Sequence, residues 1–194
     1  MTESEQQVLN LFRQTGAYLE GHFRLTSGLH SPNYLQCARV LQHPEFAERL
    51  GRDLAEKMVS AAGVKPGVVV SPAMGGLIIG HEVARALGCR HIFTEREGGA
   101  MTLRRGFSAA PDEVAFIVED VITTGGSSLE VIDLLRKSGV RAAAAGSIID
   151  RSGGRADLGI PRAALVTLDV VSWPPETCPL CAGGSPVVKP GSRA

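Results

Sequence analysis

The sequence predicts an α/β fold with a mostly parallel central sheet flanked by helices. Short apolar segments of the kind that form buried strands alternate with longer segments whose apolar residues recur at helical spacing. The clearest strand covers residues 114–118, which contain only Val, Ala, Phe and Ile. Strands read as continuous apolar runs when helices cover both faces of a parallel sheet. The order of the segments therefore indicates the fold class.

The first 62 residues are predicted to contain two helices separated by an irregular segment. Apolar side chains between residues 8 and 12 lie on one helical face, and Gly16 is expected to end that helix. Residues 23–37 mix polar side chains with Gly and Pro, so we expect a loop or an irregular hairpin. Residues 44–62 have apolar side chains at spacings of three and four, which indicates an amphipathic helix.

The rest of the chain alternates between expected strands and helices. The expected strands are 68–70, 91–93, 114–118, 142–149 and 163–168, and the expected helices are 77–87 and 129–137. Gly98 and Gly99 indicate the tip of a hairpin. The segment from Trp173 onward is rich in Pro and Gly, so we expect it to lie on the surface as an extension.

Composition places the chain among ordinary globular proteins. Hydrophobic residues make up 44% of the 194 residues and charged residues 21%, which excludes general disorder. Twenty basic residues balance 20 acidic ones, and this balance disfavours a protein that coats nucleic acid. No apolar run approaches the roughly 18 residues of a membrane helix, and residues 1–7 do not resemble a signal peptide. We therefore expect a cytoplasmic protein that binds neither membranes nor nucleic acid.

The most informative segment joins the clearest strand to the helix that follows it. Glu119 and Asp120 end the strand, and residues 123–128 supply two Thr, two Gly and two Ser. A Gly-rich turn that leads into a helix N-terminus presents unpaired N–H groups to an anion, and adjacent carboxylates can accept hydrogen bonds from sugar hydroxyls. Ser127 and Glu130 have capping-box spacing, so we expect the helix to begin near Ser127. The segment predicts a sugar-phosphate site at the sheet edge, and a capped helix behind two solvated acids is the alternative.

Residues 118–127 resemble the 5-phosphoribosyl-1-diphosphate (PRPP) signature of the type I phosphoribosyltransferases, most closely the form found in orotate phosphoribosyltransferases. Residues 23–32 are similar to the N-terminal hood segment of those enzymes, and residues 71–76 lie where the family has its pyrophosphate loop. Arg151 follows a strand at the place where the family carries an orotate-binding arginine. The resemblance implies a type I phosphoribosyltransferase fold with an N-terminal hood segment.

The resemblance also implies a single phosphoribosyltransferase domain over residues 1–194. Residues 1–43 would form mainly the first helix and the hood segment, residues 44–170 the α/β core, and residues 171–194 a C-terminal extension. A homodimer is expected, because in this family a loop of one subunit reaches the active site of its neighbour.

The implied activity is Mg²⁺-dependent transfer of the 5-phosphoribosyl group from PRPP to orotate, which gives orotidine 5-phosphate and pyrophosphate in pyrimidine (UMP) biosynthesis. Glu119 and Asp120 would bind the ribose hydroxyls and favour the positive charge that develops at C1. The implied PRPP-binding signature consists of Glu119, Asp120, Val121, Ile122, Thr123, Thr124, Gly125, Gly126 and Ser127. Mg²⁺ would be held by the pyrophosphate and ribose of PRPP, with no direct protein ligand and Asp120 as a candidate partner through water.

Arg151 is the candidate partner for the carboxylate of orotate. A guanidinium pairs with a planar carboxylate in a bidentate way. Thr26, Ser27, Tyr34 and Thr123 are further candidates for contacts with orotate. From the residues alone, a surface arginine after a strand is the better interpretation of Arg151, and Tyr34 could equally be a packing residue.

Three departures from the family pattern concern the leaving pyrophosphate. Gly75 and Thr26 stand where many bacterial relatives have lysines, and residues 94–107 lack the Lys and His residues of the family's mobile loop. The implied pyrophosphate loop is Ala73, Met74, Gly75 and Gly76.

Three arginines near the predicted hairpin could supply the missing positive charge. Arg96 matches a basic residue that precedes the family's loop, so we predict that it contacts pyrophosphate and acts in catalysis. Arg104 and Arg105 are further candidates for PRPP binding, and the hairpin would bring Arg96 near them.

Two other functions of the same fold are weighed against this one. A phosphoribosyltransferase for a purine base would have no use for Arg151, because a purine lacks a carboxylate. A PRPP-sensing regulator that binds nucleic acid is disfavoured by the neutral net charge.

Cys178 and Cys181 have the spacing of half a zinc site. Two more ligands would have to come from Cys37, Cys89 or a distant histidine, and the five histidines show no metal-ligand spacing. We therefore expect a structural turn with two free thiols.

Overall fold

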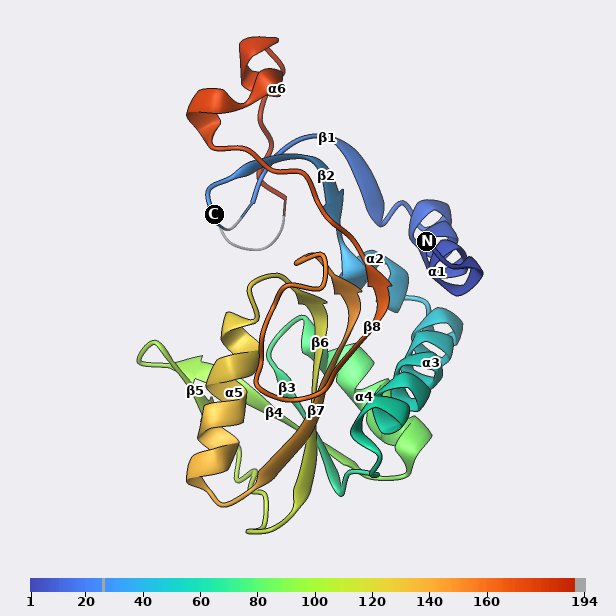
Figure 1. The fold of residues 1–194 in the computed structure, drawn as a ribbon, viewed down its shortest axis with the longest axis vertical. Coiled ribbons are helices and arrows are strands. Elements are labelled where there is room, and N and C mark those ends of the chain that lie inside the picture. The colour runs from blue at the N-terminus through green and yellow to red at the C-terminus, as the bar shows by residue number, and fades with distance from the viewer. Residues whose placement is uncertain (26, 191–194) are drawn as a thin grey trace.

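The computed structural model describes residues 1–25 and 27–190 and contains a six-stranded sheet with helices on both faces (Figure 1). The strands in the order β5-β4-β3-β6-β7-β8 are β5 (Ala100–Leu103), β4 (Arg90–Glu97), β3 (Val68–Pro72), β6 (Val114–Ile122), β7 (Arg141–Asp150) and β8 (Arg162–Thr167). Within this described sheet, β4 and β5 pair antiparallel and all the other neighbouring strands pair parallel. The predicted fold class is confirmed.

The helices lie on the two faces of the sheet and bury opposite sides of its strands. They are α1 (Glu3–Gln14), α2 (Cys37–Leu41), α3 (Pro44–Ala62), α4 (Gly76–Leu87) and α5 (Gly126–Lys137). Helix α5 covers one face, and α3 and α4 cover the other (Figure 1). Val69 packs toward the α3 and α4 side while Val68 and Val70 pack toward α5, because successive strand side chains point to opposite faces.

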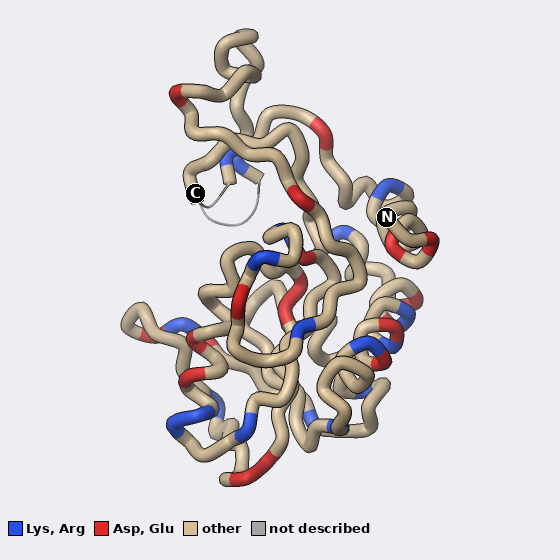
Figure 2. Tube along the Cα trace, viewed as in Figure 1, with Lys and Arg blue, Asp and Glu red and all other residues tan. Residues whose placement is uncertain are grey.

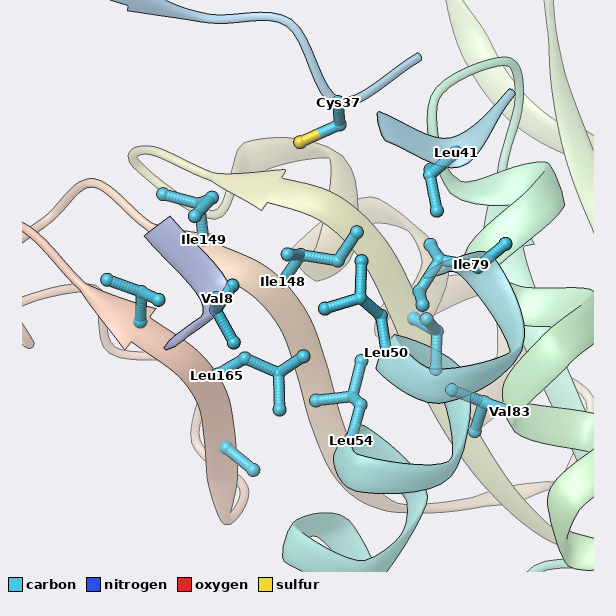
Figure 3. Packing of buried hydrophobic residues seen from close by; sticks show 14 of the residues in the cluster. Val8, Cys37, Leu41, Leu50, Leu54, Ile79, Val83, Ile148, Ile149 and Leu165 are labelled. Atoms are coloured by element: carbon cyan, nitrogen blue, oxygen red, sulfur yellow. The ribbon is translucent and has the colours of Figure 1, made fainter. Parts of the chain in front are cut away.

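Apolar packing between α3 and the sheet forms the larger core cluster. Leu50 and Leu54 of α3 point toward Ile148 of β7 and Leu165 of β8 (Figure 3). All four side chains are almost completely buried. The expected helix over 44–62 is confirmed, and its apolar face makes this contact.

Residues 18–35 and 171–190 form a separate part, which we call the hood and the tail. The hood is a hairpin of β1 (Tyr18–Arg24) and β2 (His30–Leu35), as the irregular composition predicted, although it begins before residue 23. The tail contains a short 3₁₀ helix, η1 (Pro175–Thr177), and α6 (Pro179–Ala182), and it lies against the hood (Figure 1). Residues 19–34 contribute no side chain to either apolar cluster of the described chain.

Charged residues are interspersed along the chain trace (Figure 2). Within the described residues, no helix has both the length and the apolar character needed to cross a membrane.

Candidate active site

The acid pair lies at the carboxyl end of β6, in the centre of the sheet. Glu119 is 8% exposed, and its Oε1 is buried without a hydrogen-bond partner among the described residues. Burial, together with the charge of Asp120, raises the pKa of Glu119 to about 8. Burial also raises the pKa of Asp120, although one of its oxygens accepts a hydrogen bond from the backbone N–H of Val121 at 2.9 Å. The raised pKa favours the protonated form of Glu119, which can donate to a hydroxyl as well as accept from one.

The Gly-rich loop after β6 presents the N-terminus of α5 toward this end of the sheet. Gly125 adopts a φ of +82°, and a Cβ there would lie 2.5 Å from a methyl carbon of Leu158. The helix begins at Gly126, and no side chain caps it. The predicted capping box is wrong, because Gly125 is the N-cap and Glu130 pairs with Arg96. The first N–H groups of α5 thus remain available to an anion.

The predicted pyrophosphate loop packs directly against the acid pair. A Cβ on Gly75 would collide with the carboxylate of Asp120, and a Cβ on Gly76 would lie 2.7 Å from the carbonyl oxygen of Val118. The Ala73–Met74 peptide bond is cis, and the Met74 side chain is 79% exposed. The close approach explains why residue 75 is glycine, since a lysine there would displace the carboxylate of Asp120.

Arg151 follows β7 and extends its side chain toward the hood. Its backbone N–H donates to the carbonyl of Ile122 at 2.8 Å, which fixes the position of its backbone. Its Nε is buried and has no hydrogen-bond partner among the described residues. Burial lowers the pKa of Arg151, while nearby Tyr34 and Cys37 oppose that shift. A partly buried guanidinium that is not paired with a carboxylate of the described residues favours the binding of an anionic ligand.

A cavity of about 630 Å³ lies between the hood and the carboxyl ends of β6 and β7, within the size range of small-molecule sites. Of the predicted residues it is lined by Ser27, Tyr34, Asp120, Val121, Thr123, Thr124 and Arg151. The predicted residues that are not part of its lining are Glu119, Ile122, Gly125, Gly126, Ser127, Arg96, Arg104, Arg105 and the pyrophosphate loop. Thr26 lies outside the described residues. The structure therefore brings Ser27 and Tyr34 of the hood together with Asp120, Arg151 and the two threonines of the Gly-rich loop.

The cavity also contains residues that the sequence did not indicate. Arg155 and Asp157 line it from the loop after β7, and Arg155 is paired with Asp169 at 2.7 Å. Their only sequence signal is their position, since they follow Arg151 in the loop beyond the carboxyl end of a strand.

The predicted hairpin is formed by β4 and β5, but its arginines do not converge. Arg96 donates to Glu130 of α5, with a closest distance of 2.8 Å. Arg105 pairs with Glu95 at 2.8 Å and Arg104 lies 3.5 Å from Glu97. Because strand side chains alternate between faces, the partners of Arg104 and Arg105 lie on the opposite face of β4 from Arg96. Only Arg96 is directed toward the helix that begins at the Gly-rich loop.

Comparison with known proteins assigns this arrangement to a class. Residues 37–161 match the phosphoribosyl transferase domain family, a range that contains the pyrophosphate loop, the acid pair and Arg151. The chain is 56% identical over 190 residues to orotate phosphoribosyltransferase of Heliobacterium modesticaldum, covering 98% of this chain and 99% of the relative. It is also 56% identical to the enzyme of Pelotomaculum thermopropionicum, covering 98% of each chain.

A solved structure agrees with the sequence relatives. The crystal structure of orotate phosphoribosyltransferase from Aeropyrum pernix matches with a TM-score of 0.70 and 25% identity, covering 83% of this chain and 93% of the other. The chain belongs to the orotate phosphoribosyltransferase family.

Proposed function

We propose that this chain transfers the 5-phosphoribosyl group of PRPP to orotate, giving orotidine 5-phosphate and pyrophosphate on the way to UMP. The observation that carries the proposal is the cavity lined by Arg151, Asp120, Thr123 and Thr124. The buried Nε of Arg151 has no hydrogen-bond partner among the described residues. A planar anionic acceptor suits Arg151, and a ribose phosphate suits the acid and the loop.

The acceptor is positioned by the part of the cavity between hood and sheet. Arg151 binds the carboxylate of orotate, and Ser27 and Tyr34 contact its ring from the hood. Orientation of this kind places a ring nitrogen of orotate against C1 of the ribose, where the new bond forms as the bond from C1 to the pyrophosphate oxygen breaks. Thr26 and Thr123 are additional candidates for holding the ring.

The donor is held at the ends of β6 and α5. The N–H groups and hydroxyls from Thr123 to Ser127 bind the 5-phosphate, and Asp120 and Glu119 bind the ribose hydroxyls. A carboxylate in this place stabilises the positive charge that develops at C1 in the transition state. Deprotonation of Glu119 would add to that stabilisation.

The leaving pyrophosphate is assigned to the loop of residues 73–76 and to Arg96, with Arg104 and Arg105 as further partners. Mg²⁺ bound with PRPP would supply positive charge to the pyrophosphate group. Asp120 is the member of the acid pair that lines the cavity. Its carboxylate oxygens could contact, through water, a Mg²⁺ ion carried by PRPP. The ion pair between Arg96 and Glu130 must break when PRPP binds, so that Arg96 can pair with the pyrophosphate.

We also propose a cytoplasmic homodimer. A neighbouring subunit would supply positive charge to the pyrophosphate side, where this chain's Arg104 and Arg105 engage carboxylates of their own hairpin. Light scattering on the purified protein tests the dimer, and a monomer with full activity would contradict it.

The direct test follows the ultraviolet absorbance of orotate in the presence of PRPP and Mg²⁺, with each component omitted in turn. Loss of absorbance only in the complete mixture supports the proposal. Replacing orotate by adenine should give no nucleotide, because adenine has no carboxylate for Arg151. Turnover of adenine at a similar rate would overturn the assignment of the acceptor.

A further inference from the structure

Two histidines of the hood and two cysteines of the tail meet in one cluster outside the lining of the cavity. The cluster consists of His22 on β1, His30 on β2, Cys178 before α6, and Cys181 within α6. One ligand atom from each residue lies within 4.8 Å of all the others. His22, His30 and Cys178 are 3%, 5% and 3% exposed. Among the described residues this is the only group of three or more His, Cys, Asp or Glu side chains that could hold a metal ion.

The distances within the cluster fit tetrahedral zinc. Sulfur and nitrogen ligands at Zn–S of about 2.3 Å and Zn–N of about 2.0–2.1 Å lie about 3.3–3.8 Å from one another. The Sγ of Cys181 lies 3.3 Å from Nδ1 of His30, and the Nε2 of His22 lies 3.5 Å from Cys178 and 3.7 Å from Cys181. The two imidazole nitrogens are 2.8 Å apart and would separate by about half an ångström to bind the same ion.

The opposite ring nitrogen of His22 has a partner that orients the ring. Its Nδ1 lies 2.8 Å from the carbonyl oxygen of Ser185. A carbonyl can only accept, so Nδ1 carries the proton and Nε2 presents its lone pair to the cluster. A hydrogen bond of this kind from the second ring nitrogen is typical of metal-bound histidines, whose tautomer and orientation it fixes.

The hood and tail have little else to hold them together. The tail is joined to the hood by backbone hydrogen bonds, including Trp173 with His30 and Val188 with His22 and Arg24, at 2.8–2.9 Å. Residues 19–34 take no part in the apolar clusters of the described chain. Small units without an apolar core commonly depend on a metal or a disulfide.

We propose that His22, His30, Cys178 and Cys181 bind one zinc ion, which fastens the tail to the hood. The mixture of two sulfur and two nitrogen ligands at tetrahedral spacing favours zinc over harder cations. The sequence indicated half a zinc site but not its other two ligands, because the two histidines lie 156 and 151 residues from their partner cysteines. The four residues do not line the cavity, so the proposal stands independently of the substrate.

Metal content is the first measurement. Elemental analysis of the full-length protein, dialysed under reducing conditions, should give about one zinc ion per chain. The variant Cys181→Ser should lose the ion, while the matched control Cys89→Ser, which changes a cysteine outside the cluster, should keep it. Cobalt substitution in the unaltered protein should give the absorption of a tetrahedral thiolate site, and Cys181→Ser should lose that absorption.

Stability supplies a readout that does not require a variant to fold. Removal of zinc from the unaltered protein by a chelator should lower the melting temperature by about 5 °C or more, and zinc alone should restore it. Hydrogen exchange should then accelerate in residues 18–35 and much less in the sheet.

Three results would overturn the proposal. The first is protein that binds no zinc or cobalt in these conditions. The second is equal loss of metal from Cys181→Ser and Cys89→Ser. The third is a disulfide between Cys178 and Cys181 that forms when the reduced protein is exposed to air with excess zinc, recognised by a mass lower by two hydrogens, since bound zinc would keep both thiols as ligands.

Discussion

The sheet with its helices and the hood with its tail are stabilised in different ways. Two apolar clusters fill the two faces of the sheet, and their largest side chains are fully buried. The hood and tail are joined by backbone hydrogen bonds and by the cluster of two histidines and two cysteines. The sheet is therefore stabilised by its buried apolar side chains. The hood is stabilised by a few polar contacts, which the binding of a metal ion from solution can strengthen.

The cavity lies between these two parts. Asp120 and Arg151 line it from the sheet side, and Ser27 and Tyr34 line it from the hood. The affinity for substrate should therefore depend on the contacts that hold the hood and tail against the sheet. Variants on either side of the cavity can separate the two kinds of stabilisation.

The largest effect on stability is expected in the sheet. Leu54→Ala removes a fully buried side chain between α3 and the sheet and should lower the free energy of unfolding by about 2–5 kcal/mol, measured by urea denaturation. Leu129→Ala, at a partly exposed position on α5, is the control and should cost about 1 kcal/mol or less. Zinc content should be unchanged in both, and its loss in Leu54→Ala would show that the two parts are not independent.

Asp120→Asn should leave both parts folded and remove most of the activity. The amide keeps the shape of the side chain but loses the charge that stabilises C1, so kcat should fall by about 10²- to 10³-fold. The melting temperature should stay the same or rise, because burial raises the pKa of Asp120. Asp133→Asn on the exposed side of α5 is the matched control. Full activity in Asp120→Asn would remove Asp120 from the site.

Arg151→Ala should weaken the binding of orotate and leave the binding of PRPP almost unchanged. Loss of a charged hydrogen-bond pair is worth about 1.5–3 kcal/mol, which corresponds to a rise of about 10- to 100-fold in the KM for orotate. The Kd for PRPP, measured by calorimetry, should change little. Arg136→Ala, an exposed arginine of α5, serves as the control. Equal losses for orotate and PRPP would contradict the assignment of Arg151 to the hood side of the cavity.

Glu119→Gln should make the sheet more stable at alkaline pH. The carboxyl of Glu119 loses its proton above about 4.5 in the unfolded chain but only near 8 in the folded one, so stability falls as pH rises through that window. The glutamine does not titrate, so the variant should gain on the order of 1–3 kcal/mol at pH 8 and nothing at pH 4.

A control of opposite sign is available for this pH dependence. The guanidinium of Arg90 lowers the pKa of Glu113, so Glu113→Gln should lose stability above the usual carboxylate range. Urea denaturation as a function of pH measures both variants. An unchanged pH slope in Glu119→Gln would mean that Glu119 is ionised in the folded protein.

The parts of the site that the sequence predicted are those formed by neighbouring residues. The apolar run of β6, the acid pair and the Gly-rich loop follow one another directly, so their arrangement depends on local geometry alone. The approach of Gly75 to Asp120 and the pairing of Arg96 with Glu130 depend on how β3, β4 and α5 pack. The spacing of residues along the chain cannot show such contacts, because they are set by tertiary packing.

The hood could be predicted only as an irregular hairpin for the same reason. Its partners are supplied by the tail, and the tail's Pro-rich sequence indicates neither a strand nor a helix. The histidines of the hood could be recognised as candidate metal ligands only from the fold, which places them beside Cys178 and Cys181.

The pairing of the hood with the tail also has a consequence for the newly made polypeptide. Cys178 lies 156 residues after His22, so a ribosome that adds roughly 5–20 residues per second needs about 8–30 s to synthesise the segment between them. During that interval the strands of the sheet emerge and can begin to fold while the hairpin still lacks its partners. The hood side of the cavity is thus completed late in translation. A nascent chain that already contains Asp120 and Arg151 still lacks the tail residue Ser172, which also lines the cavity.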